Sequence, residues 1–568
     1  MLTRDIDPIL FDSYSDDIPN FLKKIYAARG VGETQLSLSL AQLIKPEFPD
    51  LDKALELLTR HLEQQSTILV IGDFDCDGAT ASALAIKCLR LMGAKYADFL
   101  VPNRFEHGYG LSPEIVELAQ REKQPDLIIT VDNGISSIEG TQLAKDQGID
   151  VIITDHHLPS ETLPKADAII NPNTKDSTFA SKHLAGVGVC FYLFSALRTH
   201  LKQSGYFAKQ QIPLPDLREV LDLVALGTVA DVVKLDQNNR ILVSHGLERI
   251  RQQQCSPGIL ALLEVSNRKA EQLQASDLGF SVAPRLNAAG RLSDISCGIK
   301  CLLTRDKHDA RRYAKELEAF NQQRRQEQDR IQSEALAIVE EQEEASESFA
   351  LSLFDPSWHE GIVGIVAGKL KELHQCPVAV FAKSGDYLKG SIRSIPSVHI
   401  KDLLDLLDRQ NSALIEKFGG HAMAAGLSIK AENFWSFKRE FSQAVETHLS
   451  GEMPKLEILT DGELLVDEIS LANAKLIRAF GPWGQGFSEP IFFNEFEILE
   501  QKVLGGKHLK CTLQVPGHSQ VFESIAFFQE KVATGLATIA YKLSVNQWMG
   551  NESLQLMIEQ ITQDNQVK

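Results

Sequence analysis

Three short apolar runs along the chain are each followed at once by acidic or imidazole side chains. The runs are rich in β-branched residues, and stretches with helix-like spacing separate them, which is the pattern of parallel strands in an α/β sheet. Ligands bind at the carboxyl ends of the strands in such sheets, so we expect these polar residues to converge on one edge. The runs and their polar residues are Ser66–Gly72 with Asp73, Asp75 and Asp77, then Leu127–Val131 with Asp132, and Val151–Thr154 with Asp155, His156 and His157.

A cluster of five carboxylates and two imidazoles predicts bound cations. Carboxylates held close together repel one another strongly, and a cation removes that repulsion. Mixed oxygen and imidazole ligands suit Mg²⁺ or Mn²⁺, and a pair of such ions is the usual device for hydrolysing a phosphoester. The residue types do not separate the two metals, because both accept this ligand set.

The first motif has a rival interpretation, because Asp-x-Asp-x-Asp-Gly also opens the calcium loop of an EF-hand. That loop requires a glutamate at its twelfth position, and Leu84 stands there instead. The preceding segment also has the pattern of a strand, whereas an EF-hand loop follows a helix. A solvated acid at a strand end would account for Asp132 taken alone. It would not account for three alternating acids together with an Asp-His-His triplet.

The remaining pattern predicts several further parts. Residues 1–50 are mixed and are expected to pack as an extension on the first domain, in which strands and helices alternate from about 51 to 265. Ser112 followed by Pro113 predicts a helix start. Asp231 ends the apolar run Leu223–Ala230, where a polar residue is ordinary. Residues 306–344 lack glycine and proline and predict a long connecting helix, about 58 Å at about 1.5 Å per residue.

The last third of the chain predicts a second α/β unit and a small β-barrel. The α/β pattern covers about residues 346–450. After residue 455, turn residues separate strand-like runs, as in a small all-β barrel. Aromatic and basic residues there are candidate binding residues, although aromatic residues of a small barrel more often belong to its core. The runs are 497–503, 510–515, 521–528 and 537–545, and the candidates are Trp483, Lys507, Lys510 and Trp548.

The ordered set of motifs resembles the DHH phosphoesterase family, and within it the single-strand-specific 5′→3′ exonucleases. The resemblance covers nearly the whole chain. Two departures are visible: many relatives carry histidine where this chain has Ile71, and many read Gly-Asn-Pro where it has Gly486, Phe487 and Ser488. Besides the three segments above, the matching motifs are Asn103–Gly110, Leu226–Asp231, Ala283–Arg291, Trp358–Gly364, Gly390–Arg393 and Phe418–His421.

This resemblance implies an α/β fold with five parts. They are an N-terminal extension (1–50), a parallel-sheet DHH phosphoesterase domain (51–265), a connecting region with the long helix (266–345), a smaller α/β DHH-associated domain (346–452) and an OB-fold barrel (453–568) that binds single strands. It implies a metal-dependent exonuclease that degrades single-stranded DNA from the 5′ end to mononucleotides in DNA repair and recombination. Expected partners are single-stranded DNA, a single-strand-binding protein and a helicase. No association with a membrane is expected.

The resemblance also assigns roles to individual residues. Asp132, His156 and His157 are expected in catalysis, with Asp132 bridging two ions of Mg or Mn and His157 beside the scissile phosphate. The cleft between the two α/β domains is expected to be too narrow for duplex. The residues implied as metal ligands are Asp73, Asp75, Asp77, Asp132, His156 and Asp231, and those implied for the 5′ phosphate and the DNA path are Arg104, Arg285, Arg291, Ser391, Arg393 and His421.

Composition is consistent with a cytoplasmic globular protein. The chain has 568 residues and a net charge of −18, and it shows no apolar run long enough for a membrane span and no signal-peptide pattern. Its eight cysteines are scattered, which is simplest to explain as reduced thiols. The acidic balance argues against non-specific coating of DNA, but a local basic groove can still hold phosphates.

Two rival functions remain open at this stage. A small-substrate enzyme of the same family, such as a pyrophosphatase or an oligonucleotide phosphodiesterase, would be expected to end after the second α/β domain. A non-catalytic replication scaffold with this fold would be expected to lack some of the carboxylates. The barrel pattern argues against the first rival, and the complete acidic set argues against the second.

Overall fold

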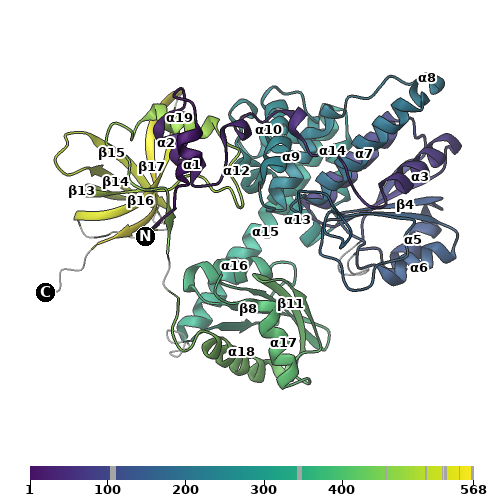
Figure 1. The fold of residues 1–568 in the computed structure, drawn as a ribbon. Helices are drawn as coiled ribbons and strands as arrows, with labels where there is room; N and C mark the ends of the chain where they lie inside the picture. The colour runs from purple at the N-terminus through teal and green to yellow at the C-terminus, as the bar shows by residue number, and fades with distance from the viewer. Residues whose placement is uncertain are drawn as a thin grey trace. The chain divides into compact units, whose positions relative to one another are not determined.

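The computed structural model describes residues 1–102, 110–341, 348–454, 457–505, 508–527, 529, 532, 534–548 and 550–563. The chain forms two compact units, each drawn in Figure 1. The first consists of Met1–Gly290, Asp294–Lys315 and Glu457–Lys568. The second consists of Arg291–Ser293 and Glu316–Leu456. Among the described residues, no helix is both long and apolar enough to cross a membrane.

The first unit contains a five-stranded sheet in which all neighbouring strands run parallel. The three runs that the sequence singled out form its central strands, which confirms that prediction. Their side chains are almost entirely buried, as expected for strands covered on both faces. In spatial order the strands are β3 (Ala97–Leu100), β2 (Ile68–Gly72), β4 (Leu127–Val131), β5 (Asp150–Thr154) and β6 (Ala168–Ile170).

Helices cover both faces of this sheet. On one face, α5 (Pro113–Glu122) and α6 (Ile138–Asp146) bury side chains against Leu69, Ile128 and Ile153. Figure 1 shows these two helices side by side against β4. The other face is covered by α4 (Cys76–Leu91) and α7 (Gly186–Gln203). The helix start predicted at Ser112 is confirmed, since its side chain accepts a hydrogen bond from the Ile115 N–H with proline at the next position.

The strand order places the acidic segments at a particular point of the sheet. The chain passes from β2 outwards to β3, then returns to the other side of β2 to form β4, β5 and β6 in sequence. The direction of winding therefore reverses between β2 and β4. In doubly wound sheets the crevice beyond the carboxyl ends of two such strands is the usual ligand site. Asp73 follows β2 and Asp132 follows β4, so both lie at this reversal.

Further helices lie in the first unit or continue from it into the second. The apolar run before Asp231 lies in helix α9 (Leu221–Ala230), so Asp231 does follow the end of an element. A π-helical turn, η5 (Leu278–Val282), leads into α13 (Ala283–Leu292). The long connecting helix predicted from the sequence is also confirmed, as α15 (Lys307–Glu341) with 35 residues.

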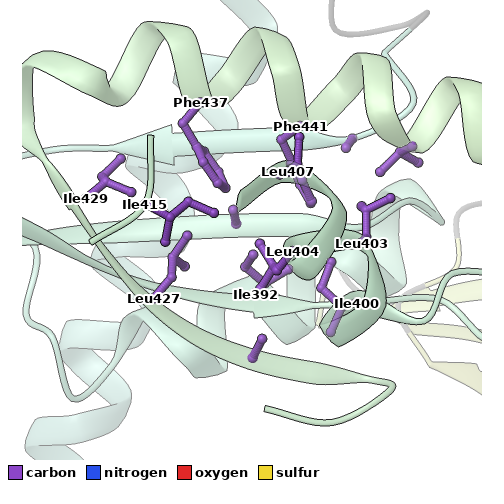
Figure 2. Packing of buried hydrophobic residues seen from close by; sticks show 14 of the residues in the cluster. Ile392, Ile400, Leu403, Leu404, Leu407, Ile415, Leu427, Ile429, Phe437 and Phe441 are labelled. Atoms are coloured by element: carbon purple, nitrogen blue, oxygen red, sulfur yellow. The ribbon is translucent and has the colours of Figure 1, made fainter. Parts of the chain in front are cut away.

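The second unit is built on a mixed five-stranded sheet. Its core lies between that sheet and two helices, α17 (Ile400–Gln410) and α18 (Phe434–His448). Figure 2 shows Phe437 and Phe441 pointing from α18 towards Ile392 and Leu404. A third helix, α16 (Val363–His374), contacts β8 and β9. In spatial order the strands are β10 (Lys417–Gly420), β11 (Ala424–Lys430), β9 (Tyr387–Arg393), β8 (Val378–Ser384) and β7 (Leu351–Phe354), of which only the pair β8 and β7 is parallel.

The C-terminal part of the first unit is a closed five-stranded barrel, as predicted. The four predicted runs fall on its first four strands. The fifth strand was not among the predicted runs, and its parallel pairing with β15 closes the barrel. The strands are β13 (Phe492–Leu504), β14 (His508–Gln514), β15 (Val521–Phe527), β16 (Gly535–Trp548) and β17 (Asn551–Thr562).

The N-terminal segment makes contacts that the sequence analysis did not anticipate. Strand β1 (Leu2–Thr3) pairs in parallel with β12 (Leu459–Thr460), just before the barrel. Tyr26, in α2 (Asn20–Ala27), stacks on Trp483 with ring centroids 6.1 Å apart. The segment expected to pack on the first domain thus also binds the region that leads into the barrel.

Candidate metal centre and phosphate cradle

The first acidic motif turns directly from β2 into α4. Asp75 is the N-cap of α4, and its Oδ1 accepts a hydrogen bond of 3.0 Å from the Gly78 N–H. Gly78 is required here, because a Cβ at this position would stand 2.5 Å from the Asp73 carbonyl oxygen. Asp77 lies in the first turn of α4 and accepts hydrogen bonds from the Gly186 and Val187 N–H groups, at 2.6 and 3.0 Å. The N-terminus of α7 therefore holds the third acid.

Asp132 leaves β4 in a left-handed backbone conformation, with φ of 62°. Its N–H donates to the Thr154 carbonyl of the neighbouring strand at 3.0 Å, so the end of β5 fixes this turn. A non-glycine residue in this region is uncommon, although aspartate tolerates it better than most. Such conformations persist where the surrounding structure determines them and are frequent at functional sites.

The Asp-His-His triplet contains one residue that supports the other two. Asp155 is buried, and its Oδ1 accepts from the backbone N–H groups of His156 and His157 at 2.7 and 3.0 Å. The same oxygen lies 2.7 Å from Nδ1 of His157, while Oδ2 accepts from the Ile135 N–H at 2.9 Å. With both oxygens engaged, Asp155 orients the histidines and is absent from the ligand groups described next.

The structure brings together every residue that was implied as a metal ligand. Donor atoms within each of three groups lie within 4.8 Å of one another. His156 Nε2 is 3.1 Å from Asp132 Oδ1 and 3.5 Å from Asp231 Oδ2, which joins the ends of β4, β5 and α9. Asp132 and His156 each belong to two groups. The groups are Asp73, Asp75 and Asp132, then Asp77, His156 and Asp231, and Asp132, His156 and His157.

The electrostatics of the cluster favour a bound cation. Burial, together with the neighbouring carboxylates, raises the pKa of Asp73, Asp132 and Asp231 well above the ordinary aspartate value. The pKa of Asp77 rises to about 7 for the same two reasons. A divalent ion would stabilise the charged carboxylates that burial and mutual repulsion penalise.

His156 is held in the form that binds a metal. Burial, and then the charge of His157, lowers its pKa to about 4, so the imidazole is neutral at ordinary pH. A hydrogen bond with the Leu184 backbone orients the ring, as is common for metal-binding histidines. Nε2 of His156 and Oδ2 of Asp231 are both buried and have no hydrogen-bond partner among the residues that the structure describes. Such atoms facing one another fit a cation, and oxygen ligands with imidazole suit Mg²⁺ or Mn²⁺.

Ser391 and Arg393 form a separate polar site in the second unit. Both lie on β9, and Arg393 Nη1 donates to Ser391 Oγ at 2.9 Å. A Cβ on Gly364, in the first turn of α16, would lie 2.8 Å from Ser391 Oγ and 3.2 Å from Arg393 Nη2. Burial lowers the pKa of Arg393. A helix N-terminus, a hydroxyl and a guanidinium thus meet around a residue without a side chain, an arrangement that suits a phosphate.

The other residues implied for DNA binding have mixed surroundings. Arg104 and Lys507 lie outside the described residues, as does the side chain of Trp548. Arg285 is buried, and its guanidinium donates to the carbonyls of Ser281 and Val265, which favours a structural role. Its assignment to the DNA path stays a prediction.

Arg291 and His421 have different surroundings. Arg291 Nη1 donates to the Gly361 carbonyl at 3.0 Å. The exposed His421 lies in the turn between β10 and β11, where its N–H donates to the Ala424 carbonyl. The roles proposed for both residues in DNA binding stay predictions.

Two of the candidate binding residues in the C-terminal part, Trp483 and Lys510, contact other protein groups. Trp483 stacks on Phe487 at 5.0 Å between centroids, and its Nε1 donates to the Ile477 carbonyl. Lys510 forms an ion pair with Glu523. These contacts favour the alternative that Trp483 is a packing residue.

Sequence reasoning missed two supports of the metal centre. Asn287 Oδ1 accepts a hydrogen bond of 2.7 Å from the Cys76 N–H, which ties α13 to the acidic loop. Gly186 packs against Asp132. The sequence does show two glycines at residues 186–188, where a helix begins. Nothing in the neighbouring residues indicated that Gly186 would contact Asp132.

Three segments match known domain families. Residues 67–228 match the DHH family, N-terminal domain, residues 346–447 match the DHHA1 domain, and residues 460–560 match the RecJ OB domain. The single-stranded-DNA-specific exonuclease RecJ of Dickeya dadantii is 48% identical over 556 residues, which cover 96% of each chain. The RecJ of Escherichia coli is 47% identical over 561 residues, again 96% of each chain.

Solved structures agree with these matches. RecJ from Thermus thermophilus in complex with Mn²⁺ aligns with a TM-score of 0.82 at 27% sequence identity, covering 99% of this chain and 79% of that chain. The complex of RecJ from the same organism with Mg²⁺ aligns with a TM-score of 0.75 at 26% identity, covering 99% and 78%.

Proposed function

The chain belongs to the RecJ family of single-stranded-DNA-specific exonucleases, and we propose that it hydrolyses single-stranded DNA from the 5′ end to mononucleotides, with Mg²⁺ or Mn²⁺ as cofactor. The observation that carries this proposal is the meeting of Asp132, His156 and Asp231 at the carboxyl edge of the sheet. Three elements that are remote in sequence supply these donor atoms, and that convergence supports a metal-dependent phosphodiesterase.

The donor groups support a site for two ions. Asp132 shares one group with Asp73 and Asp75 and another with His156, as a residue bridging two ions would. Asp77 and Asp231 complete the second group with His156. When bound, a pair of divalent ions supplies an activated water and stabilises the charge that develops on the phosphate. The six ligands of the proposal are Asp73, Asp75, Asp77, Asp132, His156 and Asp231.

His157 is assigned to the scissile phosphate. Asp155 accepts a hydrogen bond from Nδ1 of His157 in the tautomer that carries a proton on that nitrogen, so this tautomer is favoured. The pKa of His157 is raised even though burial alone would lower it, because the hydrogen bond and charge of Asp155 outweigh burial. A histidine held in this way can donate a hydrogen bond to a phosphate oxygen when it is protonated.

The 5′ end is assigned to Ser391 and Arg393. Their donors and the nearby helix N-terminus suit a phosphate, which is why we propose that this cradle takes the terminal phosphate and sets the polarity. A guanidinium offers paired donors to phosphate, which a lysine cannot reproduce. We assign Arg104 and His421 to the same end of the strand on the family pattern alone.

The cellular setting is also part of this proposal. We place the enzyme in the cytoplasm, acting in DNA repair and recombination with a single-strand-binding protein and a helicase. The relatives named above are single-stranded-DNA-specific exonucleases, and such a substrate supports this setting.

A nuclease assay tests this function. Single strands labelled at the 5′ or the 3′ end, and the corresponding duplex, are incubated with Mg²⁺ or Mn²⁺. We expect mononucleotides to appear from the 5′ end of the single strand only. Hydrolysis restricted to dinucleotides or pyrophosphate would favour a small-substrate enzyme, and binding without hydrolysis would favour a replication scaffold.

The Asp132→Asn variant links that activity to the metal centre. We expect it to lose hydrolysis and to bind less Mn²⁺ in a direct titration. Asp126→Asn is the matched control, because Asp126 lies at the amino end of the same strand, where it accepts a hydrogen bond from the Thr67 N–H. Full hydrolysis by Asp132→Asn would contradict the bridging role.

A further inference from the structure

Phe280 is an aromatic residue that the protein leaves in solvent. Its side chain is 81% exposed, although phenylalanine is among the residues most often buried. It lies in the π-helical turn η5. Such turns are rare, and they occur frequently at functional sites. A large apolar side chain held outwards by an unusual backbone needs an explanation other than packing.

The turn η5, which carries Phe280, packs on helix α9, and α9 leads to Asp231 of the metal centre. A Cβ on Gly279 would lie 3.3 Å from Val229 Cγ1, so the turn packs on the last residues of α9. Val229 precedes the ligand Asp231 by two residues. The residue before Phe280 thus packs on the last turn of α9, and the proposed ligand Asp231 directly follows that turn.

The following helix anchors the same turn to the acidic loop. Asn287, in α13, accepts a hydrogen bond from the Cys76 N–H, and a Cβ on Gly290 would collide with the Phe74 carbonyl. Arg268 Nε donates to Ser281 Oγ at 3.1 Å, which fixes the residue after Phe280. The backbone that carries the ring is thus tied to both ligand-bearing segments.

Two more exposed apolar side chains lie next to metal-centre residues. Leu158 follows His157 directly and is 66% exposed, and Val232 follows Asp231 and is 62% exposed. Val232 has a φ of 60°, a conformation that a β-branched residue rarely adopts. Exposed apolar side chains therefore follow two residues of the metal centre directly in the sequence, although the chain as a whole is strongly acidic.

We propose that Phe280 is a substrate-positioning residue that stacks on a nucleobase of the strand entering the metal centre, with Leu158 and Val232 bordering the same base-binding surface. This inference rests on the proposed function, because it needs single-stranded nucleic acid as substrate. Stacking on an aromatic ring is tolerant of sequence, since every base has a π-face. In a chain of net charge −18 long-range attraction of DNA is weak, so contacts with bases would contribute much of the binding.

The test compares intact strands with strands that lack one base. A series of 5′-phosphorylated oligonucleotides carries a single abasic nucleotide at each of the first several positions, and kcat/KM is measured for each. We expect the unmodified enzyme to hydrolyse the strand with an abasic nucleotide at the stacking position roughly 5- to 150-fold more slowly than the intact strand. Phe280→Ala should hydrolyse both strands at the same reduced rate.

Two further variants make the test specific. Phe280→Trp should restore the discrimination, and Phe280→Leu, which keeps apolar bulk without a π-face, should not. Tyr96→Ala is the control, because Tyr96 is 60% exposed but precedes β3, at the opposite edge of the sheet. It should discriminate between the strands as the unmodified enzyme does.

The outcomes separate the stacking role of Phe280 from the exonuclease function on which it rests. If Phe280→Ala discriminates against the abasic strand as strongly as the unmodified enzyme, the base stacks elsewhere and the inference is overturned. If the unmodified enzyme shows no discrimination at any position, the inference is also overturned while the exonuclease function stands. If the unmodified enzyme hydrolyses no single strand, the proposed function itself fails.

Discussion

A Cβ at Gly186 would lie 2.5 Å from Oδ1 of Asp132, a separation that real side chains do not show. The same glycine donates its N–H to Oδ2 of Asp77 at 2.6 Å. The first residue of α7 therefore touches two of the proposed ligands, one through its backbone and one through its lack of a side chain. Close approach of this kind is a reason for glycine that does not depend on a positive φ.

We expect Gly186→Ala to inactivate the enzyme without unfolding it. The new methyl group would push the Asp132 carboxylate out of position, and a misplacement of about 1 Å can lower a rate about 100-fold. The measurement is kcat on a 5′-labelled single strand together with a Mn²⁺ titration. Gly188→Ala, in the same helix, is the control, because the three atoms nearest to its Cβ would all belong to the Leu184 side chain, at 3.2 Å or more. Equal activity of the two variants would show that Asp132 can shift without loss.

We expect Asp155→Asn to reduce turnover about 10- to 100-fold, the usual effect of losing a group that orients metal ligands. The amide retains one acceptor oxygen, so it cannot serve the histidines on one side and the Ile135 N–H on the other. Steady-state rates and Mn²⁺ affinity would measure the effect. Asp167→Asn is the control. Asp167 accepts a hydrogen bond from the Val151 N–H near the amino end of β5, whereas Asp155 follows the carboxyl end of that strand. A rate equal to that of the control would mean that His156 and His157 keep their orientation without Asp155.

We expect Arg393→Lys to weaken the preference for a 5′-phosphate over a 5′-hydroxyl more than it weakens affinity for the interior of a strand. Lysine is a point charge and cannot donate to Ser391 and a phosphate in the same plane. Matched oligonucleotides are compared at one salt concentration, because phosphate contacts depend on salt. Lys389→Ala is the control, since Lys389 lies on the same strand but pairs with Glu360 at 3.0 Å. An unchanged phosphate preference in Arg393→Lys would place the 5′ end elsewhere.

The metal centre was predictable from the sequence because its chemistry is local to strand ends. Asp73, Asp132 and Asp155 each follow a buried run directly, and the topology of parallel sheets brings such positions together. Asp231 follows a helix, and only the resemblance pointed to it. Asn287 lies in the motif Ala283–Arg291, but its contact with Cys76, like that of Gly186 with Asp132, joins distant segments that no local pattern could connect.

Other features were missed because tertiary contacts decide them. Strand β17 was not among the predicted runs although Leu554, Leu556 and Ile558 stand at alternate positions, and its pairing with β15 and β16 is a tertiary contact that the run alone does not show. Arginine is usually a surface residue, but the guanidinium of Arg285 is buried and donates hydrogen bonds to two backbone carbonyls. The motif alone did not show this burial, and the assignment of Arg285 to the DNA path stays a prediction.

The pair formed by Arg29 and Asp461 is expected to hold the N-terminal segment to the barrel region. Their side chains are 4% and 2% exposed, and two hydrogen bonds of 2.5 and 3.0 Å join the guanidinium to the carboxylate. Arg29 also donates to the Ser488 carbonyl and lies 5.6 Å from the centre of the Trp483 ring. Removing one member of a buried pair leaves the other charge without compensation.

We therefore expect Asp461→Ala to lower the free energy of unfolding by about 3–5 kcal/mol, the usual cost of breaking a buried ion pair. Urea titration followed by tryptophan fluorescence would measure it, since Trp483 reports on this contact. Asp216→Ala is the control, because Asp216 forms an exposed pair with Arg218, and such pairs contribute about 0–1 kcal/mol. Replacing both Arg29 and Asp461 with apolar residues should recover much of the loss, because no charge then remains buried alone. If Asp461→Ala were as stable as the control, strand β1 and the aromatic stack around Tyr26 would suffice to hold the segment in place.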